Sequence, residues 1–203
     1  HTFGHPADLD GLLAVCERWH LALVEDAAES LGSFYRGQHT GTFGMAAGLS
    51  FNGNKIVTTG GGGAILTDRT LGVRAKYITT TAKRPHPYEF IHDEVGYNYR
   101  LPNLNAALGC AQLEQLETFL TLKRRLAERY REFFVNAPVE FIVEPAHCQS
   151  NYWLNVVICT DKIQREELLQ QINARCGRIR LGWHLMNRLP MCVNCLRGPL
   201  DNA

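Results

Sequence analysis

Three short apolar runs separated by turns and helical patterns constrain most strongly how this chain can fold. They are residues 21–24 before Glu25 and Asp26, residues 49–51 before Lys55, and residues 64–68 after four glycines at 60–63. A helical pattern precedes the first run, beginning after Asp8 and running to about His20. Strand-length runs mixed with helices are typical of an α/β layer architecture. The sequence therefore predicts an α/β fold in which 21–24 is a buried parallel strand that ends in a carboxylate.

The second half of the chain has a different pattern. From Pro102 a long amphipathic helix is predicted to run to about Phe134, with apolar residues at helical spacing. A strand at 152–159, a helix at 164–176 and a strand at 178–183 follow. This arrangement predicts a second, smaller α+β domain.

Composition excludes several function classes. The 203 residues carry 21 Lys and Arg against 20 Asp and Glu, so neither charge dominates and no nucleic-acid partner is expected. Because no apolar run is long enough to span a bilayer, no membrane insertion is expected. The cysteines lie mostly in apolar segments, which is typical of a reducing compartment, and a cytoplasmic location is expected. Cys192 and Cys195 form a single CxxC pair without a matching second pair, so no metal site is predicted.

Lys55 and Asp26 are the strongest candidates for chemistry. Lys55 follows a predicted strand, whereas the other four lysines lie in polar surroundings. A lysine in that place serves either to bind an anion or to form a Schiff base with a carbonyl group. Asp26 ends the other apolar strand, where a carboxylate needs a cation or hydrogen-bond donors. That partner is either the protonated ring nitrogen of a cofactor or a basic side chain of the core.

Ser50 and the glycine run at 60–63 are candidates for a phosphate site. A hydroxyl at a strand end can donate to a phosphate, and glycines permit close approach of the backbone. The glycines precede a strand and no Lys-Ser/Thr pair follows them, so they form neither a P-loop nor a dinucleotide fingerprint. A tight turn is the alternative.

Three segments together resemble one known family. They are VEDAAESLGSFYRGQHTGTFG, LSFNGNKIVTTGGGGAILTD and HDEVGYNYRLPNLNAALGCAQLEQL, in this order. They resemble the DegT/DnrJ/EryC1/StrS sugar aminotransferases, and SNYWLN resembles the small domain of that family. The resemblance implies the type I pyridoxal-phosphate transferase fold, as in aspartate aminotransferase. It also implies that 1–120 is the C-terminal part of a cofactor-binding large domain and 121–203 an incomplete small domain, joined by a helix at about 102–135.

The resemblance also implies a role for each site residue. Lys55 would form the Schiff base with pyridoxal 5'-phosphate and carry the proton during transfer, and Asp26 would pair with the ring nitrogen. Glu29 stands where many members have Gln near the ring hydroxyl, and Ser50 would bind the phosphate. Asn98, in GYNYR, would reach the phosphate of a neighbouring subunit, which implies a homodimer with shared active sites.

The activity implied is transamination at C4 of a nucleotide-linked 4-keto-6-deoxy sugar, with glutamate as amino donor. The FNGNK and TTGGGGAIL segments are most similar to the subgroup that acts on UDP-linked amino sugars. Two alternatives are a sugar dehydratase of the same fold, in which His replaces the lysine, and a non-catalytic regulatory protein on the same scaffold. The chain begins at His1 without Met, and both ends are expected to be cuts through a longer protein. The family's phosphate-binding turn and the aromatic residue that stacks on the cofactor are expected upstream.

Overall fold

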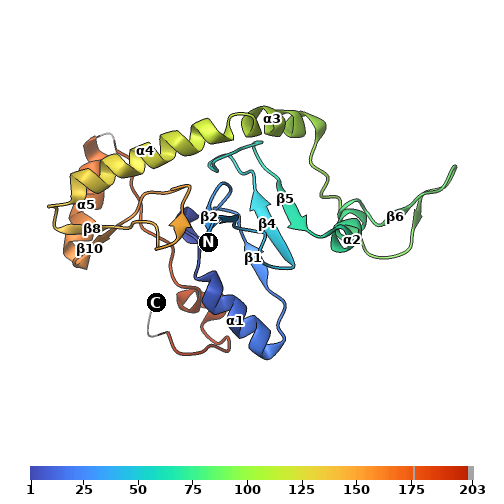
Figure 1. Ribbon diagram of the computed structural model, residues 1–203, viewed down its shortest axis with the longest axis horizontal. Helices are drawn as coiled ribbons and strands as arrows, with labels where there is room; N and C mark the ends of the chain where they lie inside the picture. Colours follow the sequence, from blue (N-terminus) through green and yellow to red (C-terminus); the bar gives the residue numbers. More distant parts are fainter. Residues whose placement is uncertain (176, 201–203) are drawn as a thin grey trace. The chain divides into compact units, whose positions relative to one another are not determined.

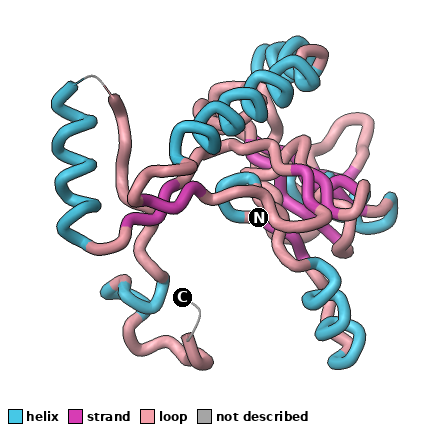
Figure 2. The backbone as a smooth tube through the Cα atoms, turned by 60° about the vertical axis from the view of Figure 1, so that its left-hand side comes forward, coloured by secondary structure: helices cyan, strands magenta, loops and turns pink. Residues whose placement is uncertain are grey.

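The computed structural model describes residues 1–175 and 177–200, in which short strands and helices are joined by long loops (Figures 1 and 2). The chain divides into two compact units, His1–Ile158 and Cys159–Ala203. The first unit contains all five predicted site residues. The predicted division into domains at 1–120 and 121–203 stays a prediction.

The first α-helix forms as the sequence predicts. A short 3-10 helix, η1 (Thr2–Gly4), precedes α1 (Leu9–Trp19). The Asp8 carboxylate accepts a hydrogen bond from the backbone N–H of Gly11 at 3.1 Å and so caps the helix start. The helix ends at His20, whose φ of 52° is left-handed and turns the chain toward the first strand.

A three-stranded sheet carries the predicted strand ends. Its strands are β1 (Val24–Asp26), β4 (Ala46–Ser50) and β5 (Gly63–Thr67), in the order β1-β4-β5. β1 runs parallel to β4, as expected for the first strand, whereas β4 and β5 are antiparallel. The expectation of a buried strand at 21–24 is wrong: the strand starts at Val24, whose exposed fraction is 64%. Among the described strands β1 lies at the edge of its sheet, next to β4 alone.

A second small sheet joins distant parts of the first unit. β2 (Phe34–Tyr35) pairs with β3 (Gln38–His39) and with β9 (Cys148–Gln149), both antiparallel. The segment after β9 is thereby placed against the start of the chain, where Ser150 Oγ donates to the Gly4 carbonyl at 2.9 Å. The backbone N–H of Asn151 donates to Ser33 Oγ at 2.9 Å. All three side chains at 33, 150 and 151 are buried, so this part of the core is built from satisfied polar groups.

The strand predicted at 152–159 is shorter than expected. Only β10 (Val157–Cys159) forms, and it pairs with β8 (Val139–Phe141). Tyr152 has a φ of 47°, and the Asn151 side chain accepts a hydrogen bond from the Trp153 backbone N–H at 2.8 Å. These local hydrogen bonds take the place of strand pairing, because Ser and Asn side chains compete with a partner strand for the backbone N–H groups.

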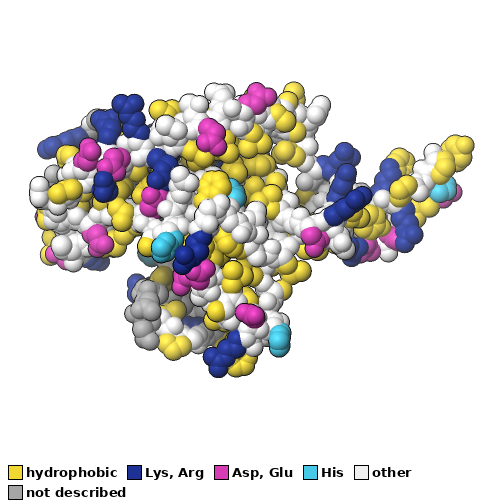
Figure 3. Space-filling view, in the orientation of Figure 1, with side chains coloured by type: hydrophobic (Ala, Val, Ile, Leu, Met, Phe, Trp, Pro, Cys, Tyr) yellow, Lys and Arg dark blue, Asp and Glu magenta, His cyan; other side chains and the backbone are white. Residues whose placement is uncertain are grey.

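A hairpin extends away from the sheet after the second helix. Helix α2 (Arg69–Thr79) is followed by β6 (Lys83–Arg84) and β7 (Ile91–His92), which form the projecting hairpin in Figure 1. Hydrophobic side chains lie at its tip (Figure 3), where Tyr88 and Phe90 are exposed. No described part of the chain therefore covers the side chains of Tyr88 and Phe90.

The long helix predicted from Pro102 to Phe134 is two helices. These are α3 (Asn103–Leu113) and α4 (Leu116–Phe134), separated at Glu114 and Gln115. Gln115 has φ −105° and ψ 3°, outside the helical region, and its N–H donates to the Gln112 carbonyl as in a tightened last turn. No Gly or Pro marks this break, so the residue types alone do not signal it.

The second unit is less regular than expected. Helix α5 (Lys162–Arg175) covers most of the helix predicted at 164–176, of which residue 176 lies outside the described residues. Two 3-10 helices follow, η2 (Met186–Arg188) and η3 (Pro190–Cys192). The strand predicted at 178–183 is wrong, since these residues are irregular. An alternating apolar pattern forms a strand only beside a hydrogen-bonding partner, and no described strand pairs with this segment. In the described part of the chain, no helix has the length and hydropathy of a membrane span.

Candidate active site

Asp26 and Ser50 end two neighbouring parallel strands. In the register of the pair, Asp26 lies opposite Gly48, and Ser50 lies two residues further along β4. Because the carboxyl ends of parallel strands lie at one edge of a sheet, the two side chains belong to the same edge. Ser50 Oγ accepts a weak hydrogen bond from the Asn52 N–H at 3.3 Å.

The buried carboxylate of β1 is Glu25, not Asp26. Glu25 has an exposed fraction of 4% and accepts hydrogen bonds from the backbone N–H groups of Gly41, Phe43 and Gly44 at 2.6–2.7 Å. His1 Nε2 lies 3.2 Å from the same carboxylate. Glu25 therefore anchors the turn between β3 and β4. Sequence reasoning missed this role, although strand alternation places Glu25 on the opposite face from its neighbours.

Asp26 is exposed, which corrects the expectation of a carboxylate enclosed in an apolar strand end. Its Oδ1 accepts one hydrogen bond, from the Ala28 N–H at 3.1 Å. The alternative of a salt bridge in the core is not seen: no described basic side chain lies within ion-pair distance of Asp26. An accessible carboxylate at a strand end can meet a cationic ligand.

Lys55 lies in the loop between β4 and β5, five residues past the end of β4, and not directly at a strand end. The loop closes on itself, since the Thr59 N–H donates to the Phe51 carbonyl at 3.0 Å and the Phe51 N–H to the Gly62 carbonyl at 2.9 Å. The Lys55 side chain has an exposed fraction of 12%. Its Nζ lies 3.7 Å from the ring centroid of Trp153 and 3.8 Å from Glu29 Oε1.

Glu29 links Lys55 to the start of the chain. Its Oε2 accepts a hydrogen bond from the Phe3 N–H at 2.8 Å, so Oε1 is left to face Lys55. The structure thus brings two of the predicted site residues together. Whether Glu29 also contacts a cofactor ring stays a prediction.

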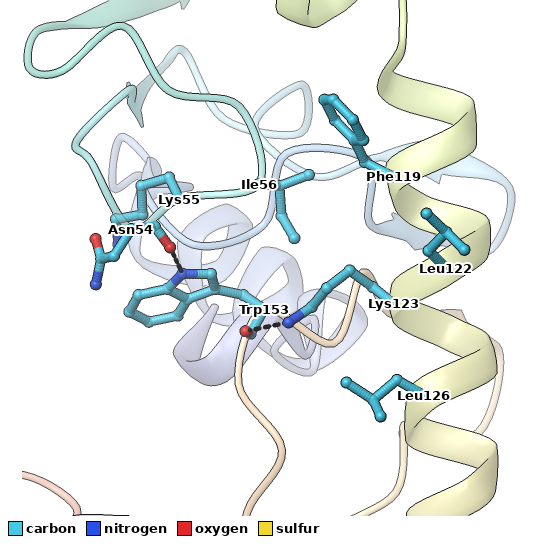
Figure 4. Close-up of a pocket in the computed structure, with 8 residues that line it drawn as sticks. All are labelled: Asn54, Lys55, Ile56, Phe119, Leu122, Lys123, Leu126 and Trp153. Carbon is cyan, nitrogen blue, oxygen red and sulfur yellow. Dashed lines mark hydrogen bonds between the residues drawn. The ribbon is translucent and has the colours of Figure 1, made fainter. Parts of the chain in front are cut away.

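Trp153 was not among the predicted site residues. Its indole N–H donates to the Asn54 carbonyl at 2.7 Å, and Lys123 Nζ donates to the Trp153 carbonyl at 2.9 Å. Figure 4 shows the indole beside Asn54 and Lys55, with the apolar side chains of α4 across the pocket. The pocket has a volume of about 330 Å3, and its lining residues are Asn54, Lys55, Ile56, Phe119, Leu122, Lys123, Leu126 and Trp153. Burial lowers the pKa of the Lys123 amine.

An ion-pair network fixes the segment that carries Trp153. Arg124 donates to both oxygens of Glu144 at 2.7 and 2.8 Å and to the Ser150 carbonyl at 2.6 Å. Glu144 also accepts from the Ser150 N–H at 2.6 Å. Burial opposes the charge of Glu144, yet the hydrogen bonds from Arg124 and Ser150 hold the pKa of its carboxyl below the ordinary value. Two residues of α4 therefore hold the segment, Arg124 at the Ser150 carbonyl and Lys123 at the Trp153 carbonyl.

Asn98 does not join this cluster. Its side chain is exposed, and its backbone bridges to Thr80 beyond the end of α2. Among the described residues, no hydrogen bond or ion pair links it to Lys55 or Ser50. A role for Asn98 in a neighbouring subunit stays a prediction.

Known proteins resemble the chain over nearly its whole length. It is 35% identical to the GDP-perosamine synthase of Escherichia coli O157:H7 over 192 residues, which cover 94% of this chain and 52% of that protein. It is 33% identical to the putative pyridoxal phosphate-dependent aminotransferase EpsN of Bacillus subtilis (strain 168), covering 94% and 50%. The crystal structure of the aminotransferase TlmJ from Streptoalloteichus hindustanus matches with a TM-score of 0.88 at 26% identity, over 95% of this chain and 53% of that one.

The matched structures confirm the predicted fold, an α/β part of a type I pyridoxal-phosphate transferase. The chain spans about half the length of the curated relatives it matches. The model of the DegT/DnrJ/EryC1/StrS aminotransferase family matches residues 1–192. This chain belongs to the DegT/DnrJ/EryC1/StrS aminotransferase family.

Proposed function

We propose that the complete protein is a pyridoxal-phosphate-dependent aminotransferase that acts on a nucleotide-linked keto sugar. The observation that carries this proposal is the amine of Lys55, largely buried between Trp153 and Glu29 in a chain that matches the family along residues 1–192. Intact Lys55 disfavours a dehydratase that uses His at this position. It also disfavours a non-catalytic regulatory protein built on the same scaffold.

The residues present fit pyridoxal phosphate by their chemistry. Lys55 offers a primary amine, Asp26 an accessible carboxylate, and Ser50 a hydroxyl at the same sheet edge as Asp26. These groups suit an aldehyde, a protonated ring nitrogen and a phosphate respectively. When bound, the cofactor supplies an electron sink for negative charge that develops beside the transferred nitrogen.

Each side chain then has one task. Lys55 would hold the cofactor through Nζ and, once free of it, would carry a proton to or from the substrate carbon. Asp26 would keep the ring nitrogen protonated by accepting its N–H, and Ser50 would donate its hydroxyl to the phosphate. Glu29 lies beside Lys55 Nζ, where it would meet the ring hydroxyl. Because a carboxylate and a phenolate repel, Glu29 takes that position only when the two share a proton.

The substrate we propose is a GDP-linked 4-keto-6-deoxy sugar, with glutamate as the amino donor. The relative from Escherichia coli is named for a GDP-linked product and is similar along 94% of this chain. The expectation of a UDP-linked substrate rests on two short segments only, and the named relatives do not support it. We therefore give more weight to the similarity over the whole length.

We expect the complete protein, loaded with pyridoxal phosphate, to move nitrogen from glutamate to the GDP-linked keto sugar. The test supplies glutamate with isotope-labelled nitrogen and either the GDP-linked or the UDP-linked 4-keto-6-deoxy sugar, and detects labelled sugar by mass spectrometry. Labelled UDP-sugar alone would reverse the choice of nucleotide. Loss of water without labelled amine would indicate a dehydratase, and absence of both reactions with intact cofactor binding would contradict the proposal.

We also propose that the active enzyme is a homodimer in which Asn98 reaches the phosphate of the partner subunit. Exposure of Asn98 and of the neighbouring hairpin tip supports this.

Mixing the inactive variants Asn98→Ala and Lys55→Ala of the complete protein should restore activity, because one site of each mixed dimer then holds both native residues. The measurement is turnover before and after subunit exchange. No recovery after exchange verified by mass spectrometry would place Asn98 outside the partner's site.

A further inference from the structure

Trp153 makes two different contacts with the lysine loop. The face of its ring lies 3.7 Å from Lys55 Nζ, and its indole N–H donates to the Asn54 carbonyl at 2.7 Å. The first contact acts on the amine and the second on the backbone that carries it. Figure 4 shows both residues on the same side of the pocket as the indole. Trp153, which is distant in the sequence, thus contacts both the amine of Lys55 and the backbone next to it.

Trp153 is itself held rigidly. Its exposed fraction is 5%, its backbone N–H donates to the Asn151 side chain, and its carbonyl accepts from Lys123. The Arg124–Glu144 ion pair fixes the backbone of Ser150, three residues earlier in the chain. A rigid indole can hold a flexible lysine, whereas a mobile one could not, since side-chain positioning depends on the rotamers of the supporting shell.

We propose that Trp153 is a positioning residue that holds the amine of Lys55 in place, its ring covering the amine and its N–H fixing the loop that carries it. This inference rests on the proposed function of Lys55. A packing role alone would require an apolar neighbour of similar size and no particular orientation. Instead, the ring face meets a cation and the ring nitrogen meets a carbonyl, which is the geometry of a cation–π contact joined to a hydrogen bond.

The test measures the reactivity of Lys55 in the cofactor-free complete protein. An amine-acylating reagent is added at one fixed pH, and the labelling rate of Lys55 is compared by mass spectrometry with that of Lys76 as an internal standard. In Trp153→Leu, the amine loses the ring that covers it and the hydrogen bond that fixes its loop. We expect Lys55 labelling to accelerate by about tenfold.

Two further variants separate positioning from packing. Trp153→Phe keeps a ring face, so the labelling rate of Lys55 should stay near that of the native protein. It lacks the N–H donor, so amide hydrogen exchange in the loop at 52–58 should quicken. Leu126→Ala removes apolar volume from the same pocket, on α4, and should change neither measurement at Lys55. Circular dichroism checks that each variant is folded, and Trp153→Phe keeps the test decisive if Trp153→Leu does not fold.

The outcomes distinguish this inference from the proposed function. Native-like labelling of Lys55 in Trp153→Leu, or acceleration as large in Leu126→Ala, would overturn the positioning role. So would a Trp153→Phe variant whose Lys55 labelling is as fast as that of Trp153→Leu. Failure of the native protein to bind pyridoxal phosphate or transfer nitrogen would instead overturn the proposed function, while the labelling result would stand on its own.

Discussion

The complete protein with Lys55→Ala should lose turnover entirely, together with the absorption band that attached pyridoxal phosphate produces. The substitution removes the one amine that the loop between β4 and β5 places beside Trp153 and Glu29. No other group can replace both its nucleophilic and its proton-carrying role, so the rate should fall to background. Absorbance titration with the cofactor and a coupled turnover assay measure the two losses.

The fold should survive this change. Lys55 contributes a contact with the Trp153 ring and an ion pair at 3.8 Å, which together stabilise the fold by no more than about 2 kcal/mol. The matched control is Lys123→Met, because Lys123 lines the same pocket and burial lowers the pKa of its amine. Borohydride trapping of the native protein should label Lys55. A label on Lys123, or an intact absorption band in Lys55→Ala, would show that the wrong lysine was assigned.

Asp26→Asn should leave the cofactor bound but reduce turnover by at least about a hundredfold, the scale of removing one electrostatic stabiliser from a closed active site. An amide cannot neutralise a protonated ring nitrogen, so the electron sink weakens. Because Asp26 is exposed and accepts a single hydrogen bond in this chain, its substitution should change the thermal stability little. Steady-state kinetics and a cofactor titration separate the two effects.

The adjacent carboxylate provides the contrast. Glu25→Gln should mainly lower the melting temperature, because Glu25 is buried and accepts three backbone N–H bonds from the turn at 41–44. Weakening bonds to a buried charged acceptor costs about 1–3 kcal/mol. If Asp26→Asn retained nearly native turnover, Asp26 would have no part in catalysis. Equal losses of stability in both variants would mean that Asp26 also supports the fold.

Local signals predicted the elements that frame the site. Asp8 caps α1 at the expected start, and the first strand is parallel to its neighbour as expected, although it begins at Val24 and not at residue 21. The strand predictions failed where the sequence pattern could not show whether a partner strand lies alongside the segment. The segment at 178–183 alternates like a strand but pairs with no described strand. The residues around Tyr152 satisfy their backbone through side chains of Ser150 and Asn151.

By itself, the sequence determined the family, the candidate chemistry of Lys55 and Asp26, and the helix and strand types near them. Caps, turns and apolar runs act over a few residues, so they can be recognised without the fold. Only the tertiary structure decided that Glu25, and not Asp26, is the buried carboxylate, since its three donors come from a turn 16 to 19 residues away. It alone placed the Trp153 ring against Lys55, with a hydrogen bond from the indole N–H to the Asn54 carbonyl that spans 99 residues. Contacts at such separations depend on how the chain packs, which no local pattern specifies.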